Sequence, residues 1–337
     1  MHLARFPRVR LVHAPTPLEF LPRLTEQLGG PRLYIKRDDC TGLATGGNKT
    51  RKLEFLLGDA LAQGATHIVT HGATQSNHVR QTAAAAARLG LQCTALLEAR
   101  IADGSVEYRN SGNVFLDRLF GARLEHRPAG LDMNAEVEQY AARLREQGEK
   151  AYAIPGGGSN HIGALGYVAS AQEILQQADA AGIVVHHVVH ATGSTGTQAG
   201  LVAGFQGSHS GVPVLGISVR AERAAQEDKV WQLASRTLQH LGVSAPLPRE
   251  AVRANSDYVG AGYGRPTPEM VEALTLLART EGILLDPVYS GKGFAGLLDL
   301  IRKGHFRQDE NVVFVHTGGA VGLFGYRDTF DPLHAAA

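Results

Sequence analysis

The sequence contains very little cysteine. Only Cys40 and Cys93 occur among its 337 residues, which excludes a framework of several disulfides and any cysteine-based zinc spacing. No hydrophobic run reaches the length that a transmembrane helix needs, and the first residues lack the apolar core of a signal peptide. These absences predict a cytoplasmic protein in a reducing compartment, with no bound metal and no membrane partner.

The chain also lacks an excess of charge of either sign. Its formal net charge is +1, from 33 Lys and Arg against 32 Asp and Glu. Nucleic-acid-binding surfaces are usually basic, so this balance argues against a nucleic-acid partner. Glycine, in contrast, is abundant at 40 residues, and it clusters with Ser, Thr and Asn in a way that is typical of loops approaching a small ligand closely.

Short apolar strands alternate with helical patterns along the whole chain. Strands are expected at residues 32–37, 67–70, 93–97, 123–125, 187–190, 213–219 and 311–315. Helices are expected at residues 21–28, 52–63, 78–89, 107–119, 132–147, 164–178, 222–241 and 266–281. This alternation predicts an α/β fold with parallel sheets covered by helices, in which ligands bind beyond the carboxyl ends of the strands.

The length of the chain predicts about two domains. The strongest break in composition is the glycine-rich segment 155–160, which is either a flexible linker or a ligand-binding loop where two domains meet. We expect a large domain formed by residues 1–52 and 161–337, with a smaller domain of residues 53–160 inserted in it.

A basic motif stands between two glycines and a helical pattern. Residues 46–48 (Gly-Gly-Asn) tolerate the backbone angles of a tight turn, and Lys49 follows them directly. A lysine amine forms Schiff bases with carbonyl cofactors when burial or a neighbouring cation lowers its pKa, and Arg51 and Lys52 are candidates for that cation. The alternative is a surface turn with a cluster of basic side chains.

The plainest anion-binding pattern is a run of small residues after the strand expected at 187–190. Its backbone N–H groups, its hydroxyls and the positive end of the next helix would suit a phosphate. It is not a Walker loop, because no Gly-Lys-Ser/Thr ends it, and its first glycines lack dinucleotide-fingerprint spacing. The alternative is a helix-capping loop. The candidate residues are Gly193, Ser194, Thr195, Gly196 and Thr197.

Two further polar segments are candidates for the site. The donors from Gln75 to His78 precede a helix and would suit a substrate carboxylate, although Ser76 or Asn77 could serve as a simple helix cap. Tyr289 stands beside a glycine turn, where a tyrosine can stack on a ring or transfer a proton. The alternative for this residue is a core tyrosine.

Six motifs in order give the chain a resemblance to a known family. It resembles the two-domain, fold-type II pyridoxal-phosphate enzymes, which are similar to the tryptophan synthase β chain. Within these it is similar to the family of D-cysteine desulfhydrase, L-cysteate sulfo-lyase and 1-aminocyclopropane-1-carboxylate deaminase. The motifs are Lys36-Arg37-Asp38-Asp39, Gly46-Gly47-Asn48-Lys49-Thr50-Arg51-Lys52, Gln75-Ser76-Asn77-His78, Gly163-Ala164-Leu165-Gly166-Tyr167, Asp286-Pro287-Val288-Tyr289 and His316-Thr317-Gly318-Gly319.

The resemblance implies a homodimer that binds pyridoxal 5′-phosphate. Lys49 would form the Schiff base, Asn77 would bond the ring hydroxyl, and Thr317 would face the ring nitrogen. Tyr289 would lie against the pyridine ring, and the loop from Gly193 to Thr197 would hold the phosphate. These roles are carried over from the family motifs onto this sequence.

The resemblance also implies how a small amino-acid substrate would be bound and converted. Ser76, with Gln75 and His78, would face its carboxylate and leaving group, and Tyr263 would lie near it. Either Lys49 or Tyr289 would remove the α-proton. The product of β-elimination would then hydrolyse to pyruvate and ammonia.

Two positions separate this chain from the deaminase pattern within the family. Ser290 and Thr317 stand where that pattern has Glu and Leu. Hydroxyls near the ring nitrogen would leave it neutral, which suits β-elimination of a good leaving group better than opening a cyclopropane ring. The deaminase is therefore a less favoured interpretation.

The leaving group is expected to be a sulfonate. The polar run of residues 71–78 includes Thr74 at a place that is apolar in the desulfhydrase pattern, and the three oxygens of a sulfonate need matching donors. The expected function is therefore a carbon–sulfur lyase that releases sulfite from L-cysteate. The alternatives are D-cysteine desulfhydrase, then the deaminase, or an α/β protein that binds a phosphate ligand without catalysis.

Overall fold

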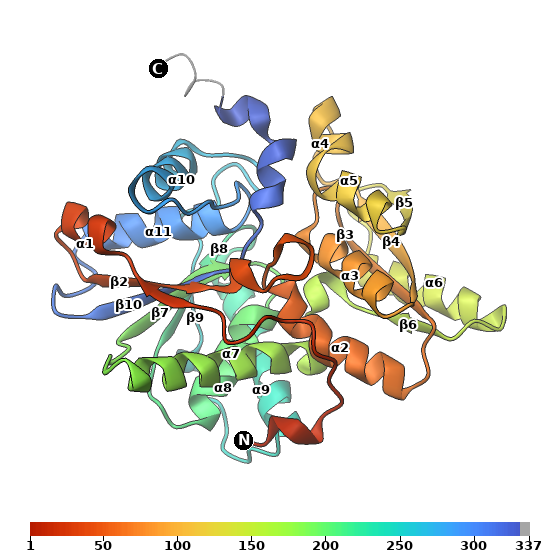
Figure 1. The fold of residues 1–337 in the computed structure, drawn as a ribbon, viewed down its shortest axis with the longest axis horizontal. Coiled ribbons are helices and arrows are strands. Elements are labelled where there is room, and N and C mark those ends of the chain that lie inside the picture. Colours follow the sequence, from red (N-terminus) through yellow and green to blue (C-terminus); the bar gives the residue numbers. More distant parts are fainter. Residues whose placement is uncertain (331–337) are drawn as a thin grey trace.

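The computed structural model describes residues 1–330, and within them the strands form two separate sheets (Figure 1). Apart from β1, which pairs antiparallel with β2, the strand pairs in both sheets are parallel. The first sheet has the order β1 (Leu18–Phe20), β2 (Arg32–Arg37), β10 (Asn311–His316), β7 (His187–Thr192), β8 (Val214–Ser218), β9 (Arg253–Asn255). The second has the order β5 (Arg123–Arg127), β4 (Gln92–Glu98), β3 (His67–Ala73), β6 (Ala151–Ala153).

Helices cover both faces of the first sheet because its central strands are apolar on both faces. In β10, Val313 and Val315 pack into one core cluster while Val312 and Phe314 pack into the other, as the two-residue period of a strand requires. The first cluster is shared with α7 (His161–Ala180), α8 (Gly196–Gly207) and α9 (Arg223–His240). The second is shared with α1 (Pro22–Leu28), α10 (Pro268–Glu281) and α11 (Ser290–Arg302).

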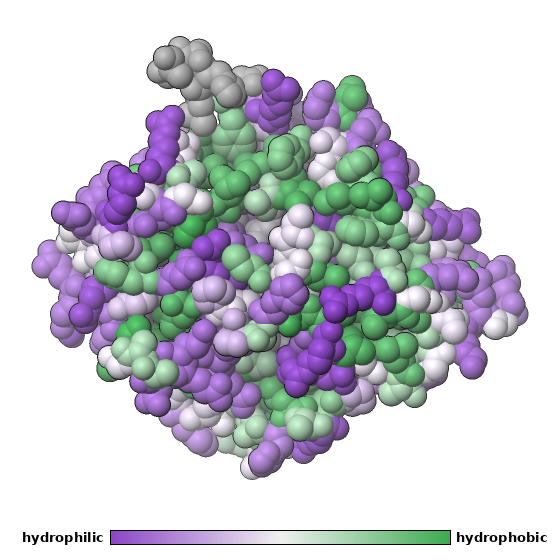
Figure 2. Space-filling view, viewed as in Figure 1, coloured by the Kyte–Doolittle hydropathy of each residue, from purple (hydrophilic) through white to green (hydrophobic). Residues whose placement is uncertain are grey.

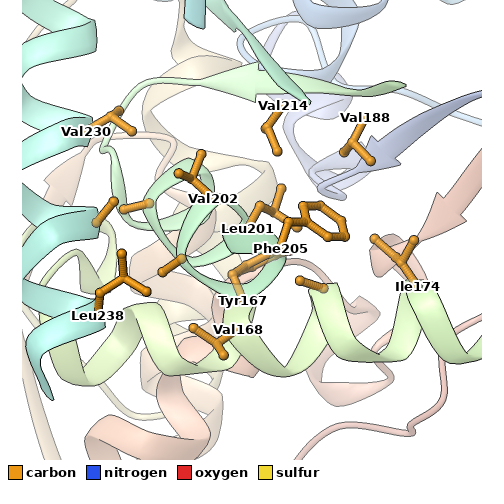
Figure 3. Close-up of a cluster of buried hydrophobic side chains, with 14 of the residues drawn as sticks. Tyr167, Val168, Ile174, Val188, Leu201, Val202, Phe205, Val214, Val230 and Leu238 are labelled. Atoms are coloured by element: carbon orange, nitrogen blue, oxygen red, sulfur yellow. The ribbon is translucent and has the colours of Figure 1, made fainter. Parts of the chain in front are cut away.

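Figure 3 shows the first of these clusters, in which Phe205 and Leu201 of α8 meet side chains of α7 and the sheet. The two helices approach closely because α8 carries glycines where they touch. A Cβ atom at Gly200 would collide with the backbone of α7, and one at Gly204 would lie 2.5 Å from the Cβ of Ala171. This packing fixes the position of the N-terminus of α8, where the expected phosphate loop lies.

The second sheet is also covered on both faces. Ile68 of β3 packs into a cluster with α2 (Lys49–Ala62) and α3 (Asn77–Arg88), and Val69 packs against α6 (Met133–Glu146) on the other face. Short helices α4 (Val106–Asn110) and α5 (Gly112–Leu119) complete this part. Helix α2 also contacts α7, where Gly166 leaves room for the α2 backbone, so α2 joins the two halves of the molecule (Figure 1).

Most of the expected elements are present, with differences that have local causes. The single helix expected at 107–119 is wrong, because the chain breaks at Ser111 and continues through Gly112 with a φ of 58°. The strand expected at 67–70 continues to Ala73. The sequence patterns did not predict β1, β6, β9 or α11.

The distribution of strands supports a two-domain division. All strands of the second sheet lie between residues 67 and 153, and those of the first sheet lie outside this range. We therefore propose the division into residues 1–52 with 161–337 and residues 53–160. The described part of the chain has no helix long and apolar enough to cross a membrane. Nor does it cluster three His, Cys, Asp or Glu side chains in a way that could hold a metal ion.

The surface of the molecule is mixed in polarity. Figure 2 shows hydrophilic residues along the margins and across the middle of one face, with apolar residues most concentrated in its upper part and others below. Large apolar side chains remain exposed at Phe115 and Leu119 of α5 and at Phe324 near the C-terminal end of the described chain.

Candidate active site

A cavity of about 410 Å³ is lined by residues from both sheets. Its wall is built from the segments that follow β3, β7 and β10 and from the first residues of α2 and α3, as expected for ligands of parallel sheets. The predicted site residues in the wall are Lys49, Ser76, Asn77, His78, Gly193, Ser194, Thr195, Thr197, Tyr263, Tyr289 and Thr317. The structure therefore brings together residues that are up to 268 positions apart in the chain (49 to 317).

Lys49 is the first residue of α2 and faces the cavity. The turn before it needs glycine, since Gly46 and Gly47 have φ values of 79° and 130° and a Cβ at Gly46 would collide with the carbonyl of Asp39. Burial lowers the pKa of Lys49 to about 8, although the carboxylate of Asp286 opposes the shift. The amine is therefore partly uncharged near neutral pH, as a nucleophile or base must be.

The cationic neighbour of Lys49 is Lys52, and the expectation that Arg51 shares this role is wrong. The Arg51 guanidinium points away from the cavity and pairs with Asp38 at 2.8 Å. The Lys52 Nζ atom instead donates to the carbonyl of Gly157 at 3.1 Å. Burial, with the charge of Lys49, lowers the pKa of Lys52 well below its usual range.

The small-residue loop before α8 has the form of an anion cradle. Thr195 has a φ of 73°, a left-handed conformation that is costly for a β-branched residue and is a recognised sign of a functional turn. A Cβ at Gly196 would lie 3.0 Å from the Lys52 Nζ atom, so the loop and this cation are adjacent. Gly196 itself does not line the cavity, and its N–H donates to the Ser159 hydroxyl at 3.2 Å.

The N-terminus of α3 presents unpaired donors to the cavity. Ser76 is the N-cap, and its hydroxyl accepts from the Val79 N–H at 3.2 Å. Within residues 1–330, the backbone N–H groups of Asn77 and His78 donate to no acceptor. They can therefore bind an anion such as a carboxylate. Burial lowers the pKa of His78 well below its usual range, which keeps its imidazole neutral.

Two predicted substrate residues are not in the cavity wall. The side-chain amide of Gln75 donates to the carbonyls of Tyr108 and Ser111 and accepts from the Asn113 N–H, at 2.7, 2.8 and 2.9 Å. It therefore holds the break between α4 and α5 in place. Thr74 is buried beside it, outside the wall.

Tyr289 and Tyr263 lie next to each other in the cavity wall. Their hydroxyl oxygens are 2.6 Å apart, and burial raises the pKa of both phenols, so both are protonated at neutral pH. Thr317 also lines the cavity, and its hydroxyl bonds to no other described side chain. Ser290, in contrast, lies outside the wall with its hydroxyl 2.6 Å from an Asp286 carboxylate oxygen, so of these two expected hydroxyls Thr317 is the one that faces the cavity.

Other residues of the wall include Arg100 and Asn134, which no sequence motif indicated, and His71, which belongs to the polar run 71–78. Arg100 lies there with its guanidinium 5.0 Å from the Tyr263 ring centroid and its Nε 2.5 Å from Glu98. It comes two residues after β4, so the rule that ligands bind beyond strand ends could have found it. His71 lies in the second half of β3 and bonds through Nε2 to Asn134 at 2.9 Å. No pattern in the sequence pointed to Asn134, which reaches the cavity from α6.

The geometry defines a class of protein: an α/β enzyme with a cleft built for a phosphate-bearing carbonyl cofactor. The donor set fits pyridoxal phosphate, because a lysine amine of lowered pKa, an anion cradle and aromatic rings line one cavity, and the Lys52 amine lies directly behind the cradle. The cradle has little room for a side chain at Gly193. A Cβ atom there would lie 3.2 Å from the Val219 side chain and 3.5 Å from the Tyr289 ring.

Comparison with known proteins identifies the family. The model of the family described as pyridoxal-phosphate dependent enzyme matches residues 9–318, and the chain belongs to this family. The chain is 48% identical to the D-cysteine desulfhydrase of Salmonella typhi over 325 residues, which cover 96% of this chain and 98% of that protein. The expected cofactor, pyridoxal phosphate, and the expected enzymatic class are thereby confirmed.

Solved structures confirm the expected fold. A crystal structure of an ACC deaminase homologue superimposes with a TM-score of 0.89 at 38% identity, covering 99% of this chain and all of that one. The structure of an O-ureido-L-serine synthase mutant gives a TM-score of 0.66 at 22% identity, covering 96% and 92% of the two chains, a likeness of fold alone. None of these relatives specifically supports the expected preference for L-cysteate.

Proposed function

We propose that this protein is a pyridoxal-phosphate-dependent lyase that converts D-cysteine to sulfide, pyruvate and ammonia. The observation that carries the proposal is the 48% identity to a D-cysteine desulfhydrase across 96% of the chain, together with a cavity that contains the residues such a reaction needs. The favoured substrate thus changes from L-cysteate to D-cysteine.

The residues that would hold the cofactor lie around one cavity. Lys49 would bind its carbonyl carbon, the segment from Gly193 to Thr197 with Lys52 would surround its phosphate, and Asn77, Tyr289 and Thr317 would contact its ring. When bound, pyridoxal phosphate links to the substrate amine and withdraws electrons from the α-carbon, which makes the α-proton removable and the β-substituent able to leave. The cavity encloses this chemistry at the junction of the two sheets.

We assign proton removal from the α-carbon to the Lys49 Nζ atom. Burial brings its pKa to about 8, close to the range in which a general base works best. Tyr289 was the other candidate, but burial raises the pKa of its phenol, so it holds a proton at neutral pH. Its hydroxyl is therefore suited to donate a proton to the departing sulfur, with Tyr263 hydrogen-bonded behind it.

The substrate carboxylate has a binding place at the start of α3. The free N–H groups of Asn77 and His78 and the positive end of the helix favour an anion there. Since Gln75 is committed to the α4–α5 junction, it would hold this segment in shape instead of touching the substrate.

One observation favours L-cysteate as a second candidate. The Arg100 guanidinium lines the cavity on the side of Tyr263, and a guanidinium is a strong partner for sulfonate oxygens. The Arg100 Nε atom is already bonded to Glu98, and this carboxylate partly neutralises the guanidinium. We therefore favour L-cysteate less than D-cysteine as the substrate.

The test is a comparison of kcat/KM for release of sulfide from D-cysteine, sulfide from L-cysteine and sulfite from L-cysteate by the purified holoenzyme. D-cysteine should exceed both others by at least about tenfold, the scale of one well-placed polar contact. A larger value for L-cysteate would replace the proposal by the sulfo-lyase, and Arg100→Gln should then reduce sulfite release selectively.

A further inference from the structure

A buried arginine lies directly behind the cofactor site. Arg80 is 0% exposed and is not part of the cavity wall, whereas Asn77, one turn earlier in α3, is. Residues three apart on a helix are neighbours on its surface. The Arg80 Nη1 atom accordingly donates to the Asn77 Oδ1 atom at 2.8 Å.

This contact determines which end of the Asn77 amide faces the cavity. A guanidinium only donates hydrogen bonds, so the amide oxygen must be the atom next to Arg80. The Nδ2 group is then directed to the other side, where it lies 2.8 Å from the position that a Cβ of Gly319 would take. No acceptor within residues 1–330 takes an Nδ2 hydrogen, which leaves it free for a ligand in the cavity.

The same guanidinium is anchored on two other sides. Nη1 also donates to the Asn113 Oδ1 atom of α5 at 2.6 Å, and Nη2 donates to the Gly46 carbonyl at 2.7 Å. Gly46 opens the tight turn that ends at Lys49. Arg80 therefore connects Asn77 with the backbone that carries the Schiff-base lysine, through three acceptors that hold its planar group in one orientation.

Arg80 keeps its charge in this buried place. Burial lowers its pKa to about 10, while the carboxylates of Asp117 and Asp286 oppose the shift. At neutral pH the group is thus a full cation with donors only. A charged donor on the oxygen of an amide polarises that amide and strengthens the N–H donors at its other end.

We propose that Arg80 is a positioning residue for the cofactor. Its guanidinium fixes the Asn77 amide so that Nδ2 donates to the ring oxygen of pyridoxal phosphate, and it holds the Lys49 turn in register with that contact. This inference rests on the proposed binding of the cofactor ring next to Asn77. Arg80 would thus act on cofactor binding through Asn77, without contacting the cofactor or the substrate itself.

The test compares the affinity of the apoenzyme for pyridoxal 5′-phosphate with that for its 3-deoxy analogue, which lacks the ring oxygen. Titrations followed by absorbance give a Kd for each, without any turnover. In the wild type the analogue should bind at least about tenfold more weakly, the scale of a hydrogen bond to a charged group. In Arg80→Lys and in Asn77→Ala the two Kd values should differ by no more than about twofold.

The ratio of the two Kd values separates this role from a merely structural one. Structural damage alone would weaken both ligands equally and leave the ratio at its wild-type value, which would overturn the proposal. The matched control is Arg51→Lys, a buried arginine that does not contact Asn77, and it should keep the wild-type ratio. A wild type that binds both compounds equally would overturn the role of Asn77, and one that binds neither would overturn the proposed function itself.

A second variant covers the case in which Arg80→Lys does not fold. Asn113→Ala removes one acceptor of the guanidinium and leaves Arg80 and Asn77 in place, so the ratio should fall between the wild-type value and unity. A wild-type ratio in Asn113→Ala, or in any folded Arg80 variant, would contradict the proposal.

Discussion

Arg51 and Lys52 are adjacent in α2 and equally buried, yet carboxylates surround the first side chain and neutral oxygens surround the second. Arg51 lies on the side of α7, where Asp38 and Glu173 each accept from its guanidinium at 2.8 Å. Lys52 lies on the cavity side, where, among residues 1–330, its amine bonds to the neutral oxygens of Gly157 and Ser159 and to no carboxylate. One helical motif thus supplies a fully paired cation to one face and, to the other, a buried amine that has no carboxylate partner among residues 1–330.

Pairing with carboxylates, or its absence, determines whether the basic side chains on each side of α2 have a structural or a functional role. Although burial alone would raise it, Arg51 lowers the pKa of Asp38, so this carboxyl stays ionised and the cluster is a fixed structural joint. On the other side burial lowers the pKa of Lys52 and brings that of Lys49 to about 8. Unpaired buried cations with lowered pKa values are typical of functional sites, whereas paired ones are typical of structure.

The largest effect that would sharpen this comparison is expected from Lys49→Ala. The variant should lose at least about a thousandfold in kcat for β-elimination, within the range seen when a catalytic acid or base is removed. It should also lose the visible absorbance that arises when the cofactor is linked to a lysine. Circular dichroism should remain that of the wild type, and wild-type turnover would show that Lys49 is not the reactive lysine.

Arg51→Met should have its main effect on stability. Removal of the guanidinium leaves the buried carboxylate of Asp38 without its ion-pair partner, whereas Glu173 keeps Lys36, and breaking a buried ion pair in this way costs about 3–5 kcal/mol. Urea unfolding would measure the loss, and the fraction that stays folded should bind pyridoxal phosphate with normal affinity. A stable Arg51→Met with weakened cofactor binding would reverse the roles assigned to the two sides of α2.

The two sides of α2 also differ in how much of their structure could be predicted from the sequence alone. The turn at Gly46 and Gly47 and the place of Lys49 at the start of a helix, facing a cleft, were predictable, because glycine permits such a turn and a helical pattern follows it. The partners of Arg51 were not, since Asp38 reaches it from the turn after β2 and Glu173 from α7, and only the packed fold brings them together. A basic cluster in a sequence does not reveal which of its charges are paired.

The same limit applies to the fold and to the rest of the site. Strand β2 was predicted at its observed bounds, because it alternates in polarity next to clear breaks. Helix α11 was not predicted because its first turns contain several glycines, which resemble a turn; Gly293 is needed there since a Cβ would lie 2.9 Å from that of Ala191. Residues that follow strands were identifiable, whereas Asn134 enters the cavity from a distant helix.

A smaller effect concerns pH. Because the pKa of Lys49 is about 8 in the folded apoenzyme and near 10.5 when unfolded, the unfolded chain binds more protons between these values. The free energy of unfolding should therefore rise with pH in this window, and Lys49→Met should show a smaller rise. Urea unfolding of both apoproteins at constant ionic strength from pH 7.5 to 9.5 would measure the difference. Parallel curves for the two proteins would contradict the lowered pKa.

The smallest effect is expected at Lys52, whose amine has no carboxylate partner within residues 1–330 and lies beside the phosphate cradle. Lys52→Met should raise the Kd for pyridoxal phosphate by about tenfold, the scale of one charge-assisted hydrogen bond, and should raise that for pyridoxal without phosphate by less than twofold. Lys52→Arg keeps the charge and is the matched control. Because Lys52→Met removes a buried amine that has no carboxylate partner among the described residues, this variant should be at least as stable as the wild type, the opposite of Arg51→Met. Equal weakening toward both compounds would mean that Lys52 supports the cavity wall and does not bind the phosphate.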